Sequence, residues 1–66
     1  MNIDLNACDI LDTFDTKDYN ATLTLWGEVN EDGIQDYFFT AMGPGGITEP
    51  QMITLGDWED AKERHA

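Results

Sequence analysis

Residues 20–42, NATLTLWGEVNEDGIQDYFFTAM, contain the clearest structural pattern in the chain. Residues 21–29 alternate apolar with polar side chains and are rich in β-branched and aromatic residues, which is typical of a half-buried strand. Residues 34–42 have a similar composition and predict a second strand. The residues between them, NEDG at 30–33, predict a turn, because Asn bonds to nearby backbone and Gly accepts positive φ without steric cost. The sequence therefore predicts an antiparallel hairpin at the centre of the fold.

The register of this hairpin depends on how its turn closes. A bulge at Gly33 predicts these cross-strand pairs: Val29 with Ile34, Leu25 with Phe38 and Leu23 with Thr40 on one face, and Trp26 with Tyr37 and Thr24 with Phe39 on the other. If one helix covers each face, Trp26 and Tyr37 are buried. If the helices cover one face only, both aromatic side chains are exposed beside acidic residues, as in a protein–protein hot spot. The pattern leaves both alternatives open.

The N-terminal segment predicts a short helix over residues 4–14. Its apolar residues form one stripe at helical spacing: Ile3, Ala7, Ile10, Leu11 and Phe14. The alternative is a first short strand over residues 3–5, which also alternate. The polar residues 15–20 predict a loop that leads into the hairpin.

The segment after the hairpin predicts a turn and a broken strand. Residues 43–46, GPGG, interrupt any regular element and predict an exposed turn. Residues 47–49 and 51–55 then read as extended chain on either side of Pro50. Because proline cannot donate a hydrogen bond to a ladder, this third strand is predicted to lie at an edge or to bend there.

The C-terminal residues 57–66 predict a second helix. Asp57 is a favourable N-cap, acids occupy the first turn and bases the last, and both complement the helix dipole. Asp60 and Arg64 form an i,i+4 pair. Trp58 is predicted to anchor this helix on the sheet. The expected fold class is α+β: a small single domain, residues 1–66, in which an antiparallel three-stranded meander carries a short N-terminal helix and a C-terminal helix.

Length and composition favour a small intracellular binding protein. A chain of 66 residues buries only about 60% of its unfolded surface, which leaves little room for a deep catalytic cleft. Cys8 is the one cysteine, so no intrachain disulfide is available and a reducing compartment is expected. No basic leader or long apolar run is present, which predicts neither a signal peptide nor a membrane span. The predicted location is the cytoplasm of a host cell.

Charge is the most unusual property of the sequence. Fourteen acids stand against Lys17, Lys62 and Arg64, for a formal net charge of −11. Small domains usually carry a net charge of magnitude about 2–8, and repulsion at this density destabilises the compact state. Nucleic acid and anionic membrane are repelled by such a surface. The expected partners are basic protein surfaces or cations.

The acids fall into two groups. Asp9, Asp12, Asp15 and Asp18 recur at every third position, so on a helix they lie near one face with Cβ atoms about 5–6 Å apart, and in extended chain they are about 10 Å apart. A row of carboxylates at that spacing can replace a phosphate backbone in a basic groove. The alternative is a solvated helix face. The second group lines the hairpin turn, where turn chemistry and protection of a sheet edge are the alternatives to partner binding: Glu28, Glu31, Asp32 and Asp36.

Metal binding and catalysis have weaker support. Residues 28–33 resemble the first half of an EF-hand loop, but the first position is Glu28 and the twelfth is Phe39, so the bidentate acid is missing. Cys8 and His65 are single and far apart, which is not a zinc ligand set. We therefore expect no cofactor and no metal, and the chain is not predicted to be an enzyme. A divalent-ion binder is the remaining minor alternative.

In size, charge and Asp spacing the whole chain resembles the small acidic inhibitors encoded by phages, which include anti-CRISPR proteins and other nucleic-acid mimics. The resemblance extends to no sequence motif, and no residue role is carried over from it. It implies inhibition of a host nucleic-acid-binding protein or CRISPR effector complex, by mimicry or by steric block of its basic groove. The alternative is a structural or adaptor subunit whose aromatic sheet face forms a homodimer or joins an assembly. The predicted partner-binding residues are Asp9, Asp12, Asp15, Asp18, Glu28, Glu31, Asp32, Asp36, Trp26 and Tyr37.

Overall fold

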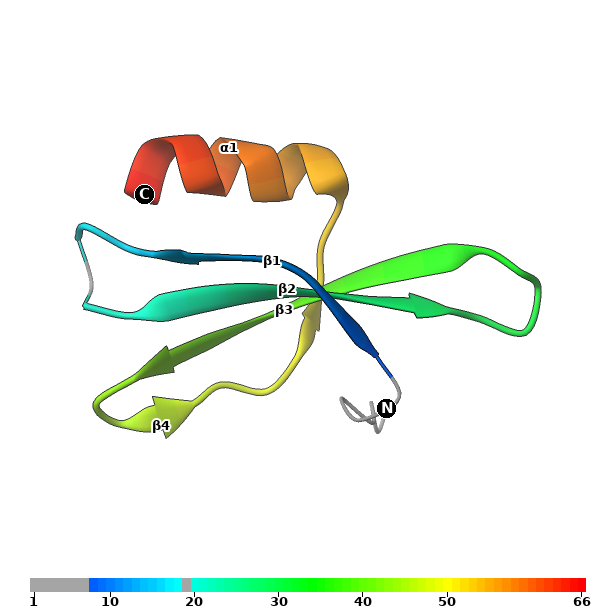
Figure 1. Ribbon diagram of the computed structural model, residues 1–66, viewed down its shortest axis with the longest axis horizontal. Coiled ribbons are helices and arrows are strands. Elements are labelled where there is room, and N and C mark those ends of the chain that lie inside the picture. Colours follow the sequence, from blue (N-terminus) through cyan, green and yellow to red (C-terminus); the bar gives the residue numbers. More distant parts are fainter. Residues whose placement is uncertain (1–7, 19) are drawn as a thin grey trace.

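The computed structural model describes residues 8–18 and 20–66. Its elements are, in chain order, β1 (Asp9–Asp15), β2 (Thr22–Val29), β3 (Gln35–Gly43), β4 (Gly46–Ile47), β5 (Gln51–Met52) and α1 (Leu55–His65). The strands form one antiparallel sheet in the order β1-β2-β3, and both β4 and β5 pair with the outer edge of β3. The helix α1 lies along one face of this sheet (Figure 1). An α+β single domain with an antiparallel sheet and a C-terminal helix is confirmed.

The predicted N-terminal helix is wrong over residues 9–14, because these residues belong to β1. Residues 4–7 of that prediction, and the alternative strand over residues 3–5, lie outside the described residues, and Cys8 is not helical. A short isolated helix is marginal, whereas β1 gains a full hydrogen-bonded ladder against β2. The apolar stripe is compatible with a strand because the register shifts between Ile10 and Asp12, so that Leu11 is the extra residue of a bulge. The predicted three-stranded meander is therefore a five-stranded sheet.

The central hairpin is confirmed, but its predicted register is wrong by one residue. Asn30 donates its backbone N–H to the carbonyl of Ile34 at 2.9 Å, so the two residues face each other across the turn. Gly33 has φ of 78°, as a three-residue loop that ends in a left-handed glycine requires. The Asn30 carboxamide oxygen accepts hydrogen bonds from the backbone N–H groups of Asp32 and Ile34, each at 3.0 Å.

A shift of one residue turns every side chain of a strand to the other face. The observed pairs are Leu23 with Ala41, Thr24 with Thr40, Leu25 with Phe39, Trp26 with Phe38, Gly27 with Tyr37, and Val29 with Gln35. Tyr37 and Phe39 consequently face α1 together with Leu25. Trp26 lies on the opposite face.

The core is the space between the sheet and α1. Phe14, Leu25 and Trp58 are buried there, and Leu23, Tyr37, Phe39 and Ile53 pack around them. The rings of Phe14 and Trp58 lie 5.1 Å apart with their planes tilted by 59°, a geometry worth about 0.5–1.5 kcal/mol beyond the area it buries. Trp58 is only 1% exposed, which confirms it as the anchor of the helix.

The predicted start of the C-terminal helix is two residues late. Thr54 is the N-cap in place of Asp57, and its hydroxyl oxygen accepts the backbone N–H of Asp57 at 3.1 Å. Asp57 lies in the first turn, where its charge complements the helix dipole. The predicted pair of Asp60 and Arg64 is confirmed at 3.1 Å. No helix in the described part of the chain is long and apolar enough to cross a membrane.

The predicted break at Pro50 and the predicted turn at residues 43–46 are both confirmed. Gly43 pairs with Gly46 at the end of a tight β3–β4 hairpin, and Gly46 has φ of 113°. Pro50 separates β4 from β5, each of two residues. These short strands cover parts of the outer edge of β3, and β2 lies between β1 and β3 from Thr22 to Gly27.

Candidate functional site

The aspartates of the N-terminal segment do not form the predicted row. Adjacent residues in a strand point to opposite faces, so a spacing of three residues alternates sides except where a bulge intervenes. The bulge keeps Asp9 and Asp12 on the face of α1, opposite Gly27 and Leu25, whereas Asp15 lies opposite Thr22 on the other face. Asp18 follows the end of β1. The prediction that these aspartates lie near one helix face is therefore wrong, and those of β1 divide between the two faces of the sheet.

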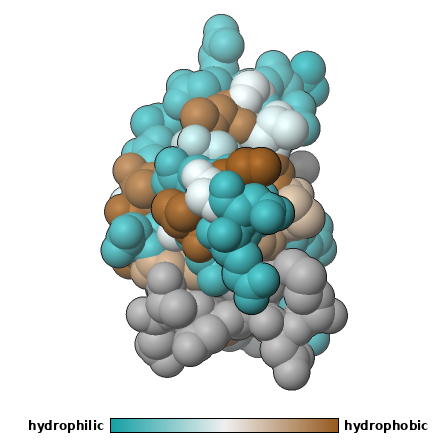
Figure 2. Space-filling view, turned by 90° about the vertical axis from the view of Figure 1, so that its right-hand side faces the viewer, coloured by the Kyte–Doolittle hydropathy of each residue, from teal (hydrophilic) through white to brown (hydrophobic). Residues whose placement is uncertain are grey.

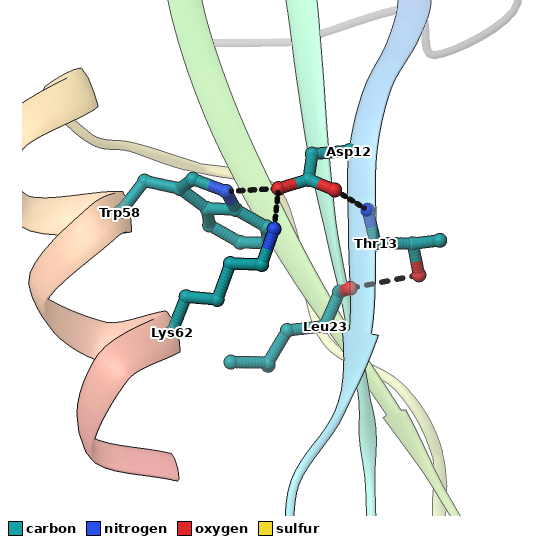
Figure 3. A network of polar contacts seen from close by, with 5 residues as sticks. All are labelled: Asp12, Thr13, Leu23, Trp58 and Lys62. Atoms are coloured by element: carbon teal, nitrogen blue, oxygen red, sulfur yellow. Dashed lines mark hydrogen bonds and ion pairs between the residues drawn. The ribbon is translucent and has the colours of Figure 1, made fainter. Parts of the chain in front are cut away.

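Asp12 holds α1 against the sheet (Figure 3). Its Oδ2 atom accepts the indole Nε1–H of Trp58 at 3.0 Å and the ammonium of Lys62 at 2.8 Å, and its Oδ1 atom accepts the backbone N–H of Thr13 at 2.9 Å. The hydrogen bonds from Lys62 and then Trp58 lower the pKa of the Asp12 carboxyl to about 2. The hydrogen bond to Asp12 also raises the pKa of Lys62. This carboxylate is committed to helix docking.

Asp18 and Asp15 also have partners inside the molecule. The Asp18 carboxylate lies 3.0 Å from Nδ1 of His65, near the end of α1. Beside it, the backbone N–H of Lys17 donates to the carbonyl of His65 at 2.6 Å. The Asp15 carboxylate accepts the Thr22 hydroxyl at 2.7 Å. Asp12 and Asp18 thus tie β1 and the residues after it to α1.

The second predicted group of acids gathers on the part of the hairpin that projects past α1 (Figure 1). Glu28 and Asp36 are directly opposite each other on β2 and β3, and Glu31 and Asp32 are exposed at the turn. Like charges directly opposite across a sheet are destabilising, so this pair opposes folding. Asp9 lies at the base of the projection, opposite Gly27. We call these residues the acidic arm: Asp9, Glu28, Glu31, Asp32 and Asp36.

Polar contacts fix part of the acidic arm. The Asn30 carboxamide donates to the Asp36 carboxylate at 3.3 Å, and the Cys8 thiol donates to the Glu28 carboxylate at 3.9 Å. Val29 and Ile34 next to the turn are 65% and 61% exposed. Figure 2 views the molecule from this end and shows hydrophilic and hydrophobic residues side by side. Exposed aliphatic side chains therefore lie among the carboxylates of the acidic arm.

The cations lie at the other end of the molecule. No Lys, Arg or His occurs between Asp18 and Ala61 in the sequence. Lys62 pairs with Asp12, Arg64 with Asp60, and His65 with Asp18. The acidic arm consequently has no counter-charge on its own strands, β2 and β3.

Trp26 and Tyr37 do not form the predicted shared aromatic face. Tyr37 is half-buried in the core under α1. Trp26 is half-buried on the opposite face, where its Nε1–H donates to the hydroxyl of Thr40 at 3.0 Å. The predicted pairing failed because it depended on the register that the turn shifts by one residue.

The described residues offer little for catalysis or metal binding. Among them, no group of three or more His, Cys, Asp or Glu is placed to hold a metal ion. A depression of about 310 Å³ lies beside the β1–β2 connection and is lined by Asp15, Thr16, Asn20, Ala21 and Thr22. These residues are mostly polar, whereas small-molecule sites are mostly apolar.

No protein-family model matches this chain, and no curated protein or solved structure matches it. The separation of charge is therefore the main functional signal of the molecule. It is partly visible in the sequence, because Lys17, Lys62 and Arg64 all lie outside the hairpin. The cluster of Asp12, Trp58 and Lys62 was missed, and its one sequence signal is the i,i+4 spacing of Trp58 and Lys62 on α1.

Proposed function

We propose that this protein is a small acidic binding protein that inhibits a nucleic-acid-binding host protein or a CRISPR effector complex. The acidic arm enters the basic groove of the target and excludes the nucleic acid by mimicry or by steric block. The observation that carries this proposal is the acidic arm itself, whose carboxylates have no counter-charge on β2 or β3. The site of action is the cytoplasm of the host cell.

The geometry of the acidic arm suits a groove that binds phosphates. Glu28 and Asp36 are directly opposite each other, and such residues in an antiparallel pair have Cβ atoms about 4.5–5.5 Å apart. Closely spaced negative charges of this kind are also what a phosphate backbone presents to a basic groove. A hydrogen-bonded hairpin also holds its charges in place before binding, which reduces the entropy lost on association.

The arrangement favours binding over catalysis. The Asp12 carboxylate and the Lys62 ammonium form an ion pair that lowers the pKa of Asp12 and docks α1 on the sheet. The strands β2 and β3 carry no Lys, Arg or His beside the carboxylates of the acidic arm. The Cys8 thiol that donates to Glu28 is buried, as inert structural cysteines are. Glu28 and Asp36 face each other despite the cost of repulsion, and a cationic partner would remove that cost.

A displacement assay tests the proposal. The protein is titrated into CRISPR effector complexes and other nucleic-acid-binding proteins that hold a fluorescent duplex, at about 50 mM and 200 mM salt. Because salt also weakens the binding of the duplex to the target, the affinity of the protein for the target is measured directly at both salt concentrations. With ion contacts of slope about 0.7 each, a few contacts predict at least about a tenfold loss of that affinity. The variant Glu31→Lys/Asp32→Lys/Asp36→Lys should lose inhibition at both salt concentrations.

The matched control is Glu49→Lys/Glu59→Lys/Glu63→Lys, which makes the same change of net charge at exposed positions outside the acidic arm. The concentration of this control variant needed for half-maximal inhibition should be no more than about ten times that of the unmodified protein. Equal losses in the two variants would show that net charge alone matters and would overturn the role of the acidic arm. A directly measured affinity for the target that is flat with salt would overturn the electrostatic mechanism.

A further inference from the structure

The sheet face opposite α1 carries two apolar rows. Ile10, Trp26, Phe38 and Met52 are aligned directly across β1, β2, β3 and β5. Four residue pairs further along the β2–β3 ladder, Met42 on β3 lies opposite Ile47 on β4. Because directly opposite residues share a face, these side chains all point away from the helix. We call Ile10, Trp26, Met42, Ile47 and Met52 the outer face.

The outer face is exposed, although its centre is fixed. Ile10, Met42, Ile47 and Met52 are 61%, 56%, 59% and 65% exposed. Phe38 and Thr40 between them are buried. The hydrogen bond from Trp26 to Thr40 holds the indole ring over the sheet. Exposed apolar side chains on both sides of a rigid centre are a feature of interaction surfaces.

Charge decides which occupant suits this face. Glu28 and Asp36 border it at the end nearer the acidic arm, and Asp15 borders it at the other end. The strands β1 to β5 contain no Lys, Arg or His. A second copy of the chain, which also carries a net charge of −11, would set carboxylates against carboxylates at both borders. A partner with cations beside its apolar side chains would neutralise them.

We propose that the outer face binds an amphipathic cationic segment of the target protein. Apolar side chains of the segment contact Met42, Ile47 and Met52, and its Lys or Arg side chains meet Glu28 and Asp36. Methionine suits such a surface because its flexible thioether adapts to the shape of a partner. The inference deepens the proposed function and rests on it for the cationic character of the partner.

A synthetic helical peptide with Leu on one face and Lys on the other is the probe. The control peptide has the same composition in a scrambled order, so that its charge is equal but its Leu residues share no face. We expect the amphipathic peptide to bind at least about tenfold more tightly in calorimetry. The variant Met42→Ser/Met52→Ser should lose that advantage.

The matched control variant is Leu11→Ser/Leu55→Ser, which removes exposed apolar side chains outside both the outer face and the acidic arm and should bind like the unmodified protein. Equal binding of the two peptides, or equal losses in the two variants, would overturn the inference. A concentration-dependent dimer in sedimentation that Met42→Ser/Met52→Ser dissolves would also overturn it, in favour of a second copy. Suppose that Met42→Ser/Met52→Ser loses its preference for the amphipathic peptide and still inhibits the target as the unmodified protein does. In that case the proposed function stands and the outer-face inference fails.

Discussion

Asp12 shows how much of this small fold depends on one side chain. Its carboxylate is the meeting point of β1 and α1, and it satisfies the indole N–H of Trp58, a residue that is 1% exposed. A buried donor without a partner pays the full cost of losing water. In a chain of 66 residues with stability of only a few kcal/mol, this single hydrogen bond is a substantial fraction of the total.

Replacing Asp12 with Ala should destabilise the protein by about 1–3 kcal/mol, because Trp58 loses its acceptor and Lys62 its counter-charge. Asp12→Asn keeps an acceptor oxygen and should cost less. Denaturant unfolding measures both. The control is Asp9→Ala, an exposed acid on the same strand, for which a change within about 0.5 kcal/mol is expected. Equal losses for Asp12→Ala and Asp9→Ala would show that the contact with Trp58 contributes nothing.

The same carboxylate predicts a pH dependence at the acid end. The pKa of Asp12 is about 2 in the folded protein and has an ordinary value of 3.8. The unfolded chain therefore binds this proton more tightly, so the stabilisation is present above about pH 4 and is lost as pH falls towards about 2. The side chain is 31% exposed, so solvent screening reduces the effect.

Urea unfolding at a series of pH values between about 5 and 2 measures this contribution. The difference in the free energy of unfolding between the unmodified protein and Asp12→Asn should shrink across that interval. A difference that stays constant down to about pH 2 would mean that the proton of Asp12 is not linked to folding.

At the scale of single elements, local chemistry made the hairpin and the last helix predictable. Asn30 and Gly33 shape the turn in which they lie. Arg64 pairs with Asp60 on α1, and Trp58 packs α1 on the sheet directly beneath it. The register was harder to predict, because one more residue in the turn separates a pairing of Val29 with Ile34 from the observed pairing with Gln35. The segment Asp9–Asp15 has helical spacing of apolar residues, yet forms β1, because β2 offers a ladder that the local pattern does not reveal.

The residues of the candidate site also divide into those that local sequence predicts and those that depend on tertiary structure. The acids at the hairpin turn were found because a turn exposes its residues wherever the hairpin lies. The aspartates of β1 were misplaced because their faces depend on the secondary structure of that segment. The partner of Asp12 is Lys62, which comes from α1 at the other end of the chain. Such a contact depends on tertiary docking, which no local pattern reports.

The turn between β2 and β3 supports a prediction for the stability of this hairpin. Gly33 has φ of 78°, a conformation that costs a residue with a Cβ atom about 1–2 kcal/mol. Gly33→Ala should therefore destabilise the protein by about that amount in thermal or denaturant unfolding. Gly45→Ala is the matched control, since Gly45 lies in the other turn without positive φ and a Cβ atom there would meet nothing within 4 Å. Equal stability of the two variants would argue against a left-handed conformation at residue 33.

At the scale of the whole molecule, charge is separated along the sheet. The Cα envelope measures 37 × 25 × 16 Å, and screening in about 0.1 M salt acts over about 10 Å. The cations near the end of α1 are therefore too far away to neutralise the tip of the acidic arm. Repulsion within the acidic arm persists in the free protein, and a cationic partner relieves it on binding.

This separation predicts that salt stabilises the free protein. Screening weakens the ion pairs of Lys62, Arg64 and His65, but exposed pairs contribute little and repulsion dominates at a net charge of −11. We expect Tm to rise with sodium chloride, and a gain of about 1 kcal/mol corresponds to about 4–8 °C in a domain of this size. The variant Glu31→Gln/Asp32→Asn should be more stable at low salt and gain less from added salt. If its stability and its salt response match those of the unmodified protein, the acids at the turn do not repel their neighbours, and relief of repulsion cannot contribute to partner binding.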